Sequence, residues 1–418
     1  MEKHFYKYCL TVMTLLSPLL SYTQNSVSKL RIDPARAYGG AVSEYFENVK
    51  YIPLETTKES LFGEINQMIV TDNSVVIYDI DTKAVLFFTL EGKYISKVNL
   101  RDANYVYLSK SQDGNIVISM SKNIREGSSL VESIFSTTGI KIKQASLSSF
   151  QDGLLKIDEG YFLGTSSCGF NKNDKPKDSL YHLINVYKED SLYKSLLPYN
   201  QKHQAVFCKI GGIVDLNPRG LRVTDNSIYV STPYEHLVYK VTKDTAVKML
   251  QFVFPLKRSI SDNILSSGNL QLIDSIERQI NVNGSTIIQS VKNIVFYKDK
   301  ILFKITPKSY IRTPGSVSTQ QFNFIYDTPS SRLISMERLA PDMHNFFLPI
   351  LGNGSMIVFD GLYFHKGAYY TPLSSLEMFT AHVATKSKNP QYPEVLKKYF
   401  NTQTRKSNPV IVCMKLKE

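Results

Sequence analysis

Residues that could perform chemistry are few in this chain, and none of them forms a familiar catalytic motif. The sequence has no G-x-S-x-G nucleophile elbow, no H-E-x-x-H zinc motif, no phosphate-binding P-loop and no C-x-x-C pair. His236 and His365 are the better candidates for a metal site gathered from separate segments, but no two histidines recur at metal-ligand spacing. An ordinary hydrogen-bonded histidine is the simpler interpretation of each. The sequence therefore identifies no metal site and no cofactor.

Aromatic and basic side chains near expected turns are the better candidates for a functional site. Tyrosine rings stack on sugars, and cations bind acidic groups, so such residues suit a glycan or a peptide at the mouth of a central channel. The alternative interpretation is that alternating aromatic residues fill the space between strands. The candidate ligand-binding residues are Tyr105, Tyr107, Arg219, Arg222, His365 and Lys366.

The elements that must position these residues are indicated by a repeated phrase. The run Val70–Ser74 leads into a β-rich stretch, and Val223–Ser227 leads into another with the same Val-Thr-Asp-Asn-Ser sequence. The two copies lie about three units of roughly 50 residues apart, which is within the size range of propeller blades. Self-similarity at this scale is typical of a repeat architecture in which each unit packs against the next.

Weaker copies of this pattern complete the set of repeats. Turn residues precede β-rich runs at Asp113–Asn115, Asp158–Gly160, Asp299–Lys300 and Asn353–Ser355. Short strands separated by Gly, Asp and Asn turns indicate consecutive hairpins. We therefore expect an all-β fold, a six-bladed β-propeller with four strands per blade and small helical insertions near the C-terminus. The chain has no Trp, so it lacks the Trp-Asp dipeptide of WD40 blades.

Three stretches carry a family resemblance. Tyr51–Thr56 and Asn73–Val98, together with the C-terminal run Asn408–Lys417, resemble the six-bladed β-propeller envelope proteins of Bacteroidetes. The resemblance covers nearly the whole chain after its N-terminal segment, and its motifs are structural. It implies a propeller fold and an envelope location, and it implies no reaction.

The two ends of the chain are expected to meet in one blade. Residues 24–44 are interpreted as an N-terminal leader and 45–418 as the propeller, with strands at Val49–Glu55 and 410–416 pairing to close the ring. Between about 371 and 406, apolar residues recur at helical spacing and are interrupted by prolines, which predicts a helical insertion. We favour a packing role for this insertion over a partner-binding role. A shorter helical pattern is expected within Leu256–Gly284.

The N-terminal residues predict export. Residues 1–23 combine Lys3 and Lys7 with the apolar run Cys9–Leu20 and a small-residue cleavage site before Gln24, as signal peptides do. This run is shorter than the ~20 residues that span a bilayer, and no later apolar run reaches that length. An exported chain meets oxidising conditions, which permit a disulfide between Cys168 and Cys208, although two free thiols are the favoured interpretation.

The net charge of the chain and its expected export restrict the classes of partner and function. The formal net charge of +12 suits an anionic polysaccharide or a membrane surface, and export disfavours nucleic acid. We expect a secreted or periplasmic, non-catalytic binding or interaction propeller whose partner is a glycan, a peptide or an envelope protein. The alternative is a propeller lyase or hydrolase with an axial metal site, because propellers support both binding and catalysis.

Overall fold

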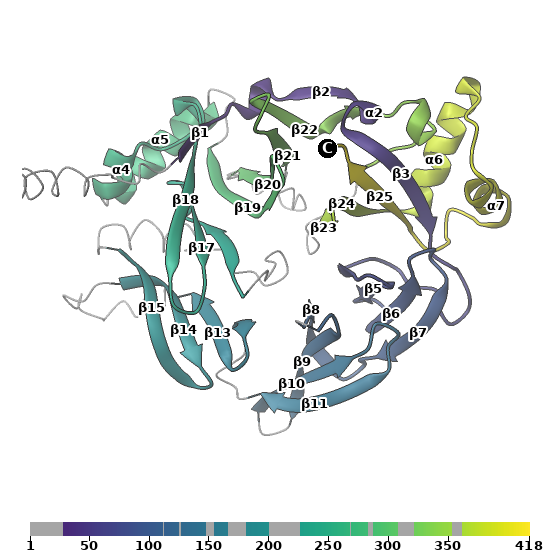
Figure 1. Cartoon of the computed structure of the whole chain (residues 1–418), viewed down its shortest axis with the longest axis horizontal. Coiled ribbons are helices and arrows are strands. Elements are labelled where there is room, and N and C mark those ends of the chain that lie inside the picture. Colours follow the sequence, from purple (N-terminus) through teal and green to yellow (C-terminus); the bar gives the residue numbers. More distant parts are fainter. Residues whose placement is uncertain are drawn as a thin grey trace, which may run out of the picture.

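The computed structural model of the protein is a ring of six β-sheets, which confirms the expected six-bladed β-propeller (Figure 1). It describes residues 28–111, 113–124, 127–147, 154–165, 181–199, 226–267, 269–282, 287–307, 322–352 and 362–418. The expected signal peptide lies outside the described residues. We number the blades in chain order, from the first hairpin after residue 60.

The first three blades are each built from four consecutive antiparallel strands. Blade 1 contains β4 (Gln67–Val70), β5 (Ser74–Asp79), β6 (Ala84–Thr89) and β7 (Tyr94–Asn99). Blade 2 contains β8 (Ala103–Lys110), β9 (Ile116–Ile124), β10 (Gly127–Phe135) and β11 (Lys141–Leu147). Blade 3 contains β12 (Leu155–Asp158), β13 (Tyr161–Thr165), β14 (Tyr181–Lys188) and β15 (Ser191–Tyr199).

The other three blades each combine consecutive strands with a strand from the N-terminal part of the chain. Blade 4 contains β16 (Ile228–Ser231), β17 (Leu237–Val241), β18 (Ala246–Val253) and β1 (Ser28–Arg31). Blade 5 contains β19 (Ile288–Tyr297), β20 (Lys300–Pro307), β21 (Phe322–Asp327), β22 (Arg332–Ala340) and β2 (Tyr38–Ala41). Blade 6 contains β23 (Tyr363–His365), β24 (Ala368–Leu373), β25 (Val410–Leu416) and β3 (Phe46–Pro53).

The N-terminal strands form a belt along the outer edges of blades 4, 5 and 6 (Figure 1). Strand β1 pairs in parallel with β18, β2 pairs in parallel with β22, and β3 pairs antiparallel with β25. The leader expected at 24–44 therefore differs from the structure, since its residues 28–31 and 38–41 are strands of two blades. Strands of only four residues give no alternating pattern in the sequence, and their pairing depends on distant edges.

The ring is closed in blade 6, where β25 lies between β24 and β3. Its side chains Val410, Ile411, Val412 and Met414 are fully buried. Asn408, just before this strand, is also fully buried, and its side chain bonds to backbone groups of the segment that connects β3 to β4. The closing strand is therefore fixed to both blade 6 and the start of blade 1.

Five clusters of the hydrophobic core among the described residues each join two neighbouring blades, and a sixth packs around the two α-helices that precede blade 5. One cluster joins blades 1 and 2, and others join blades 3 and 4, 4 and 5, 5 and 6, and 6 and 1. In blade 1, for example, Val76 and Phe87 face blade 2, whereas Val75 and Phe88 face blade 6. This alternation follows from the period of two along a strand, and it explains why these strands are apolar on both faces.

Local side-chain chemistry fixes the hairpin turns between strands. In the β4–β5 turn, the Thr71 hydroxyl accepts hydrogen bonds from the backbone N–H groups of Asn73 and Ser74, at 3.2 and 2.9 Å. Thr242 accepts equivalent bonds from Asp244 and Thr245 in the β17–β18 turn. Hydroxyl residues at such positions favour turns because their side chains replace a strand partner.

The helices are insertions outside the sheets. After the short helix α2 (Val42–Tyr45), α4 (Asp262–Ser267) and α5 (Leu270–Val282) precede blade 5, and α6 (Ser375–Thr385) and α7 (Glu394–Thr402) interrupt blade 6. Helix α6 starts at Ser375 rather than near 371, because Ser374 and Glu377 form a capping box and residues up to Leu373 complete β24. Short 3₁₀ helices lie at Pro34–Arg36, Leu256–Arg258, Met343–Asn345 and Lys386–Lys388. No helix among the described residues is long and apolar enough to cross a membrane.

Candidate functional site

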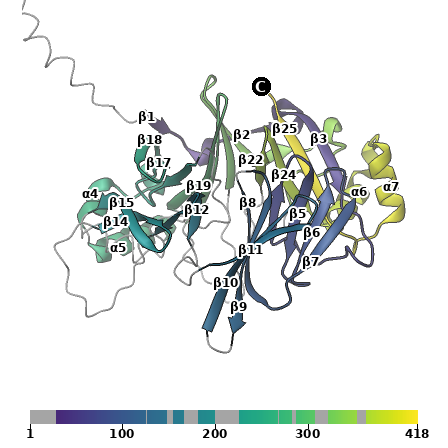
Figure 2. The same ribbon diagram turned by 60° about the horizontal axis from the view of Figure 1, so that its bottom comes forward.

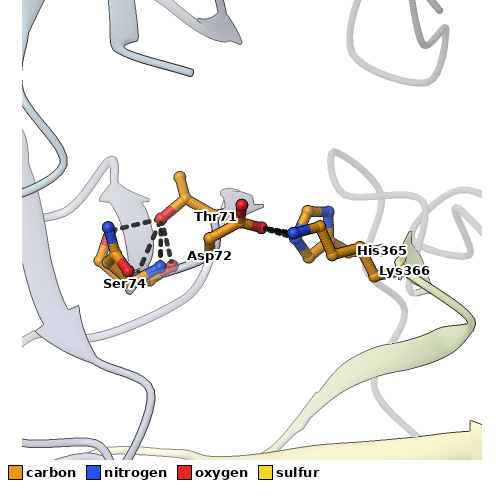
Figure 3. A network of polar contacts seen from close by, with 6 residues as sticks. Thr71, Asp72, Ser74, His365 and Lys366 are labelled. Atoms are coloured by element: carbon orange, nitrogen blue, oxygen red, sulfur yellow. Dashed lines mark hydrogen bonds and ion pairs between the residues drawn. The ribbon is translucent and has the colours of Figure 1, made fainter. Parts of the chain in front are cut away.

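A polar cluster joins the first turns of blades 1 and 6, at the closure of the ring. Asp72 lies in the β4–β5 turn of blade 1, whereas in blade 6 His365 ends β23 and Lys366 lies in the β23–β24 turn. Figure 3 shows the hydrogen bonds between Thr71 and Ser74 next to the contacts of Asp72 with His365 and Lys366. Each turn follows the first strand of its blade, β4 in blade 1 and β23 in blade 6. The two turns therefore occupy equivalent positions in the two blades.

The β23–β24 turn has a backbone that presents Lys366 to solvent. Lys366 and Gly367 have φ angles of 46° and 79°, as in the two central residues of a type I′ hairpin turn. A Cβ at Gly367 would lie 2.3 Å from the Tyr297 hydroxyl of blade 5, so only glycine fits there. The position of Lys366 is therefore set by the turn and by the neighbouring blade.

Three side chains meet at this cluster. The Asp72 Oδ1 atom lies 3.0 Å from His365 Nε2 and 2.7 Å from Lys366 Nζ. The side chains of Asp72 and Lys366 are 58% and 69% exposed, whereas that of His365 is only 14% exposed. A largely buried imidazole thus supports an exposed carboxylate and an exposed ammonium group.

The electrostatics of the cluster keep Asp72 ionised. The hydrogen bond from Lys366, followed by that from His365, lowers the pKa of the Asp72 carboxyl below its usual value of 3.8. The exposed pair consequently offers a strong acceptor and a strong donor next to each other. Two neighbouring hydroxyls of a sugar can satisfy both groups, one by donating to the carboxylate and the other by accepting from the ammonium.

A second cluster of similar composition joins blades 3 and 4. The Lys243 Nζ atom lies 3.3 Å from Asp158 Oδ2 and 4.5 Å from the centre of the Tyr161 ring. The Tyr193 hydroxyl donates to Asp244 Oδ1 at 2.8 Å, and its ring meets that of Tyr161 edge to face at 5.2 Å. Tyr193 is 46% exposed, so part of its ring remains open to a ligand.

The residues expected from the sequence to bind ligand are not all brought together. His365 and Lys366 lie in one cluster, whereas Tyr105 and Tyr107 lie in β8. The Gln67 side chain at the start of β4 bonds to the Val106 carbonyl at 2.7 Å and to the Leu108 N–H at 2.9 Å. The two tyrosine positions are therefore beside the start of β4, whereas Asp72 follows its end. Arg219, Arg222, Cys168 and Cys208 lie outside the described residues.

Neither histidine candidate belongs to a metal centre among the described residues. No group of three His, Cys, Asp or Glu side chains with a suitable geometry occurs there. His236 is buried between blades 4 and 5, with its Nε2 atom 3.1 Å from the Ile288 carbonyl oxygen and its ring against Phe254. Burial lowers the pKa of His236 to about 4, so it is a neutral packing residue at physiological pH.

The sequence did not single out Asp72, Tyr161, Tyr193 or Lys243 as site residues. Asp72 belongs to the repeated phrase, but its partner His365 is 293 positions away. Asp72 and Lys243 lie in hairpin turns and Tyr161 directly follows one, whereas Tyr193 lies within β15, so proximity to a turn was the available signal for the first three. Aromatic and basic residues selected at those turns, rather than along whole strands, would have included Tyr161 and Lys243.

Comparison with known proteins gives a family and a fold. Among curated proteins, no sequence matches this chain. A solved structure described as a "putative exported protein" from Bacteroides fragilis NCTC 9343 superposes with a TM-score of 0.60 at 12% identity, covering 94% of this chain and all of that one. A protein of unknown function from Bacteroides thetaiotaomicron VPI-5482 has a TM-score of 0.38 at 12% identity, covering 91% of this chain and 75% of its own.

The B. fragilis structure shares the fold of this chain, and at that identity it indicates the fold alone. The sequence profile of the Domain of unknown function (DUF4934) matches residues 31–415, from the belt strand β1 to the closing strand β25. This match covers nearly all of the described ring. The chain therefore belongs to the DUF4934 family.

Proposed function

We propose that this protein is an exported, non-catalytic binding propeller whose ligand is a glycan. The observation that carries the proposal is the cluster of Asp72, His365 and Lys366, in which exposed groups from two blades converge on equivalent turns. A rigid ring holds these turns, and ligand-binding residues are concentrated in loops that a rigid scaffold positions. Export is supported by the signal-peptide pattern of residues 1–23 and by the description of the B. fragilis structure.

Sugar recognition is favoured by the chemistry of the two clusters. Glycans present many neighbouring hydroxyls and one apolar ring face, and they require both acceptors and donors at fixed spacing. The Asp72–Lys366 pair supplies one acceptor and one donor 2.7 Å apart, and the Tyr193 ring supplies a partly open aromatic surface. The net charge of +12 further favours glycans that carry acidic groups.

A glycan array followed by titration calorimetry tests this function. Replacing Lys366 with Ala or Asp72 with Asn removes one of the two charged groups that would bond to the sugar, so each change should weaken binding by about tenfold or more. Lys93→Ala is the matched control, because Lys93 is an exposed lysine of the β6–β7 turn in blade 1 and lies outside both clusters. Its affinity should equal that of the unmodified protein.

Two results would contradict the proposed function, and a third would contradict the proposed site. One is binding of peptides but of no glycan, which would reassign the ligand class. The other is a stoichiometric divalent ion in the purified protein together with turnover of lactone, ester or glycan substrates, which would make it an enzyme. Equal affinity of the Lys366→Ala and Lys93→Ala variants for the bound glycan would show that the cluster of Asp72, His365 and Lys366 does not bind it.

A further inference from the structure

The helical insertion of blade 6, residues 374–409, carries a concentration of positive charge. It contains six cations and only the two carboxylates Glu377 and Glu394, a net charge of +4 out of +12 for the whole chain. The insertion makes up less than a tenth of the sequence. All six cationic side chains are exposed: Lys386, Lys388, Lys397, Lys398, Arg405 and Lys406.

Most of this charge is not compensated within the part of the chain that the structure describes. Lys397 reaches Glu394 at 3.9 Å, and Lys388 lies over the Phe347 ring at 4.7 Å. For the other four cations, no described carboxylate comes within ion-pair distance. Such a concentration of uncompensated charge attracts an anionic surface through its combined field.

Exposed aliphatic side chains occur in the same insertion. Leu376 and Val383 are 53% and 63% exposed, and their spacing of seven residues puts them on one side of α6. Val395 on α7 is 49% exposed and lies one turn before Lys398. The buried positions on the same two helices are Met378, Leu396 and Tyr399.

The exposure of these residues does not reflect a loose insertion. Phe379, His382, Tyr399 and Phe400 pack together between the two helices, and the His382 and Phe400 rings stack at 4.1 Å. The buried Tyr399 hydroxyl donates to the Ser375 hydroxyl at 2.7 Å. Helices α6 and α7 project from the rim of the ring beside β3 (Figures 1 and 2). They therefore form a firm platform with an apolar and basic outer surface.

We propose that this platform docks the propeller on the surface of an anionic lipid bilayer. Cations on a helix bind acidic headgroups, while neighbouring aliphatic side chains enter the headgroup boundary. The three aliphatic residues are spread over two helices, so a fluid surface suits them better than one rigid acidic protein. Docking of this kind is peripheral, and it uses a surface separate from the glycan site of blades 1 and 6.

Sedimentation with lipid vesicles tests the proposal on the exported full-length chain. At about 50 mM salt, the protein should bind vesicles of about 30% phosphatidylglycerol in phosphatidylcholine and should be released near 1 M salt, where screening acts within ~3 Å. Each cation contributes about fivefold, equivalent to about 1 kcal/mol, so Lys386→Gln, Lys398→Gln, Arg405→Gln and Lys406→Gln together should weaken binding by two orders of magnitude or more.

A matched control separates this surface from net charge. Lys141→Gln, Lys143→Gln, Lys194→Gln and Lys248→Gln remove four exposed lysines from blades 2, 3 and 4 and give the same net charge. This control should bind vesicles nearly as the unmodified protein does. Leu376→Ser with Val383→Ser should also weaken binding, by about tenfold. Because the chain has no Trp, Val383→Trp provides a single reporter whose emission should shift to shorter wavelength on binding.

Three outcomes would overturn the proposal. The first is no sedimentation of the unmodified protein with anionic vesicles at low salt. The second is an equal loss of binding in the two fourfold variants, which would assign binding to net charge alone. The third is binding to immobilised polyglutamate but not to vesicles, which would make an acidic protein the partner.

Discussion

The side chain of Asn408 ties the closing strand to the start of blade 1, and replacing it tests how the ring is closed. Its Oδ1 atom accepts from the Phe62 N–H at 3.2 Å, and its Nδ2 group donates to the carbonyls of Glu55 and Ser60 at 2.8 and 2.9 Å. The backbone of Asn408 makes separate bonds with Thr56 and Ser375, which an alanine would keep. Asn408→Ala therefore removes only the side-chain contacts.

The expected cost follows from the groups left without partners. The Glu55 carbonyl keeps its hydrogen bond from the Ser60 hydroxyl. The main losses are therefore the hydrogen bonds that the Phe62 N–H and the Ser60 carbonyl make with the Asn408 side chain. An unsatisfied buried polar group costs about 1–3 kcal/mol, so the free energy of unfolding should fall by about 2–5 kcal/mol. That is a large part of the ~5–15 kcal/mol that stabilises a typical domain.

Urea unfolding followed by circular dichroism measures this loss. The control is Asn401→Ala, because Asn401 is exposed on α7 and surface changes usually stay within about 0.5 kcal/mol. The Asn408→Ala variant should unfold at clearly lower urea than this control. Equal midpoints for the two variants would refute the account of how the ends of the ring are joined.

Three further predictions concern pH and the N-terminal belt. The pKa of His236 is lowered to about 4 in the folded state from about 6.5, so the stability it contributes is present above pH 6.5 and is lost as the pH falls toward 4; His236→Asn, which tolerates the φ of 53°, should flatten this slope in urea titrations. The pKa of Asp72 is also lowered, so its contribution is present above 3.8 and disappears at more acidic pH, and Asp72→Asn should remove that component of acid unfolding. Deleting residues 28–31 uncovers the edge of β18, and light scattering should detect self-association that the full chain does not show.

The fold was predictable because its signals are local in the sequence. The Thr71 hydroxyl bonds to backbone groups two and three residues away, so the phrase Val70–Ser74 specifies a turn by itself, and its second copy at Val223–Ser227 indicates a repeat. Strand β25 was equally clear as an apolar run. The belt strands β1 and β2 were not predictable, because a run of four residues is too short to show an alternating apolar pattern. The distant strand with which each of them pairs in parallel cannot be identified from one sequence.

The candidate site was predictable only in part. His365 and Lys366 stood out by residue type next to a turn, but their contact with Asp72 depends on ring closure between positions 293 residues apart. Tyr105 and Tyr107 were selected by residue type within β8. The contacts of Gln67 with β8 place these two positions beside the start of β4, which the sequence does not show. In the helical insertion, spacing alone could not separate the inner from the outer apolar residues, because both recur every three to four positions.

The most direct test of the central claim is a crystal structure of the protein with the glycan that binds most tightly on an array. The account predicts sugar hydroxyls within about 3.2 Å of both Asp72 and Lys366, at the turns that join blades 1 and 6. A glycan bound elsewhere on the ring, with no sugar atom in contact with Asp72 or Lys366, would contradict it.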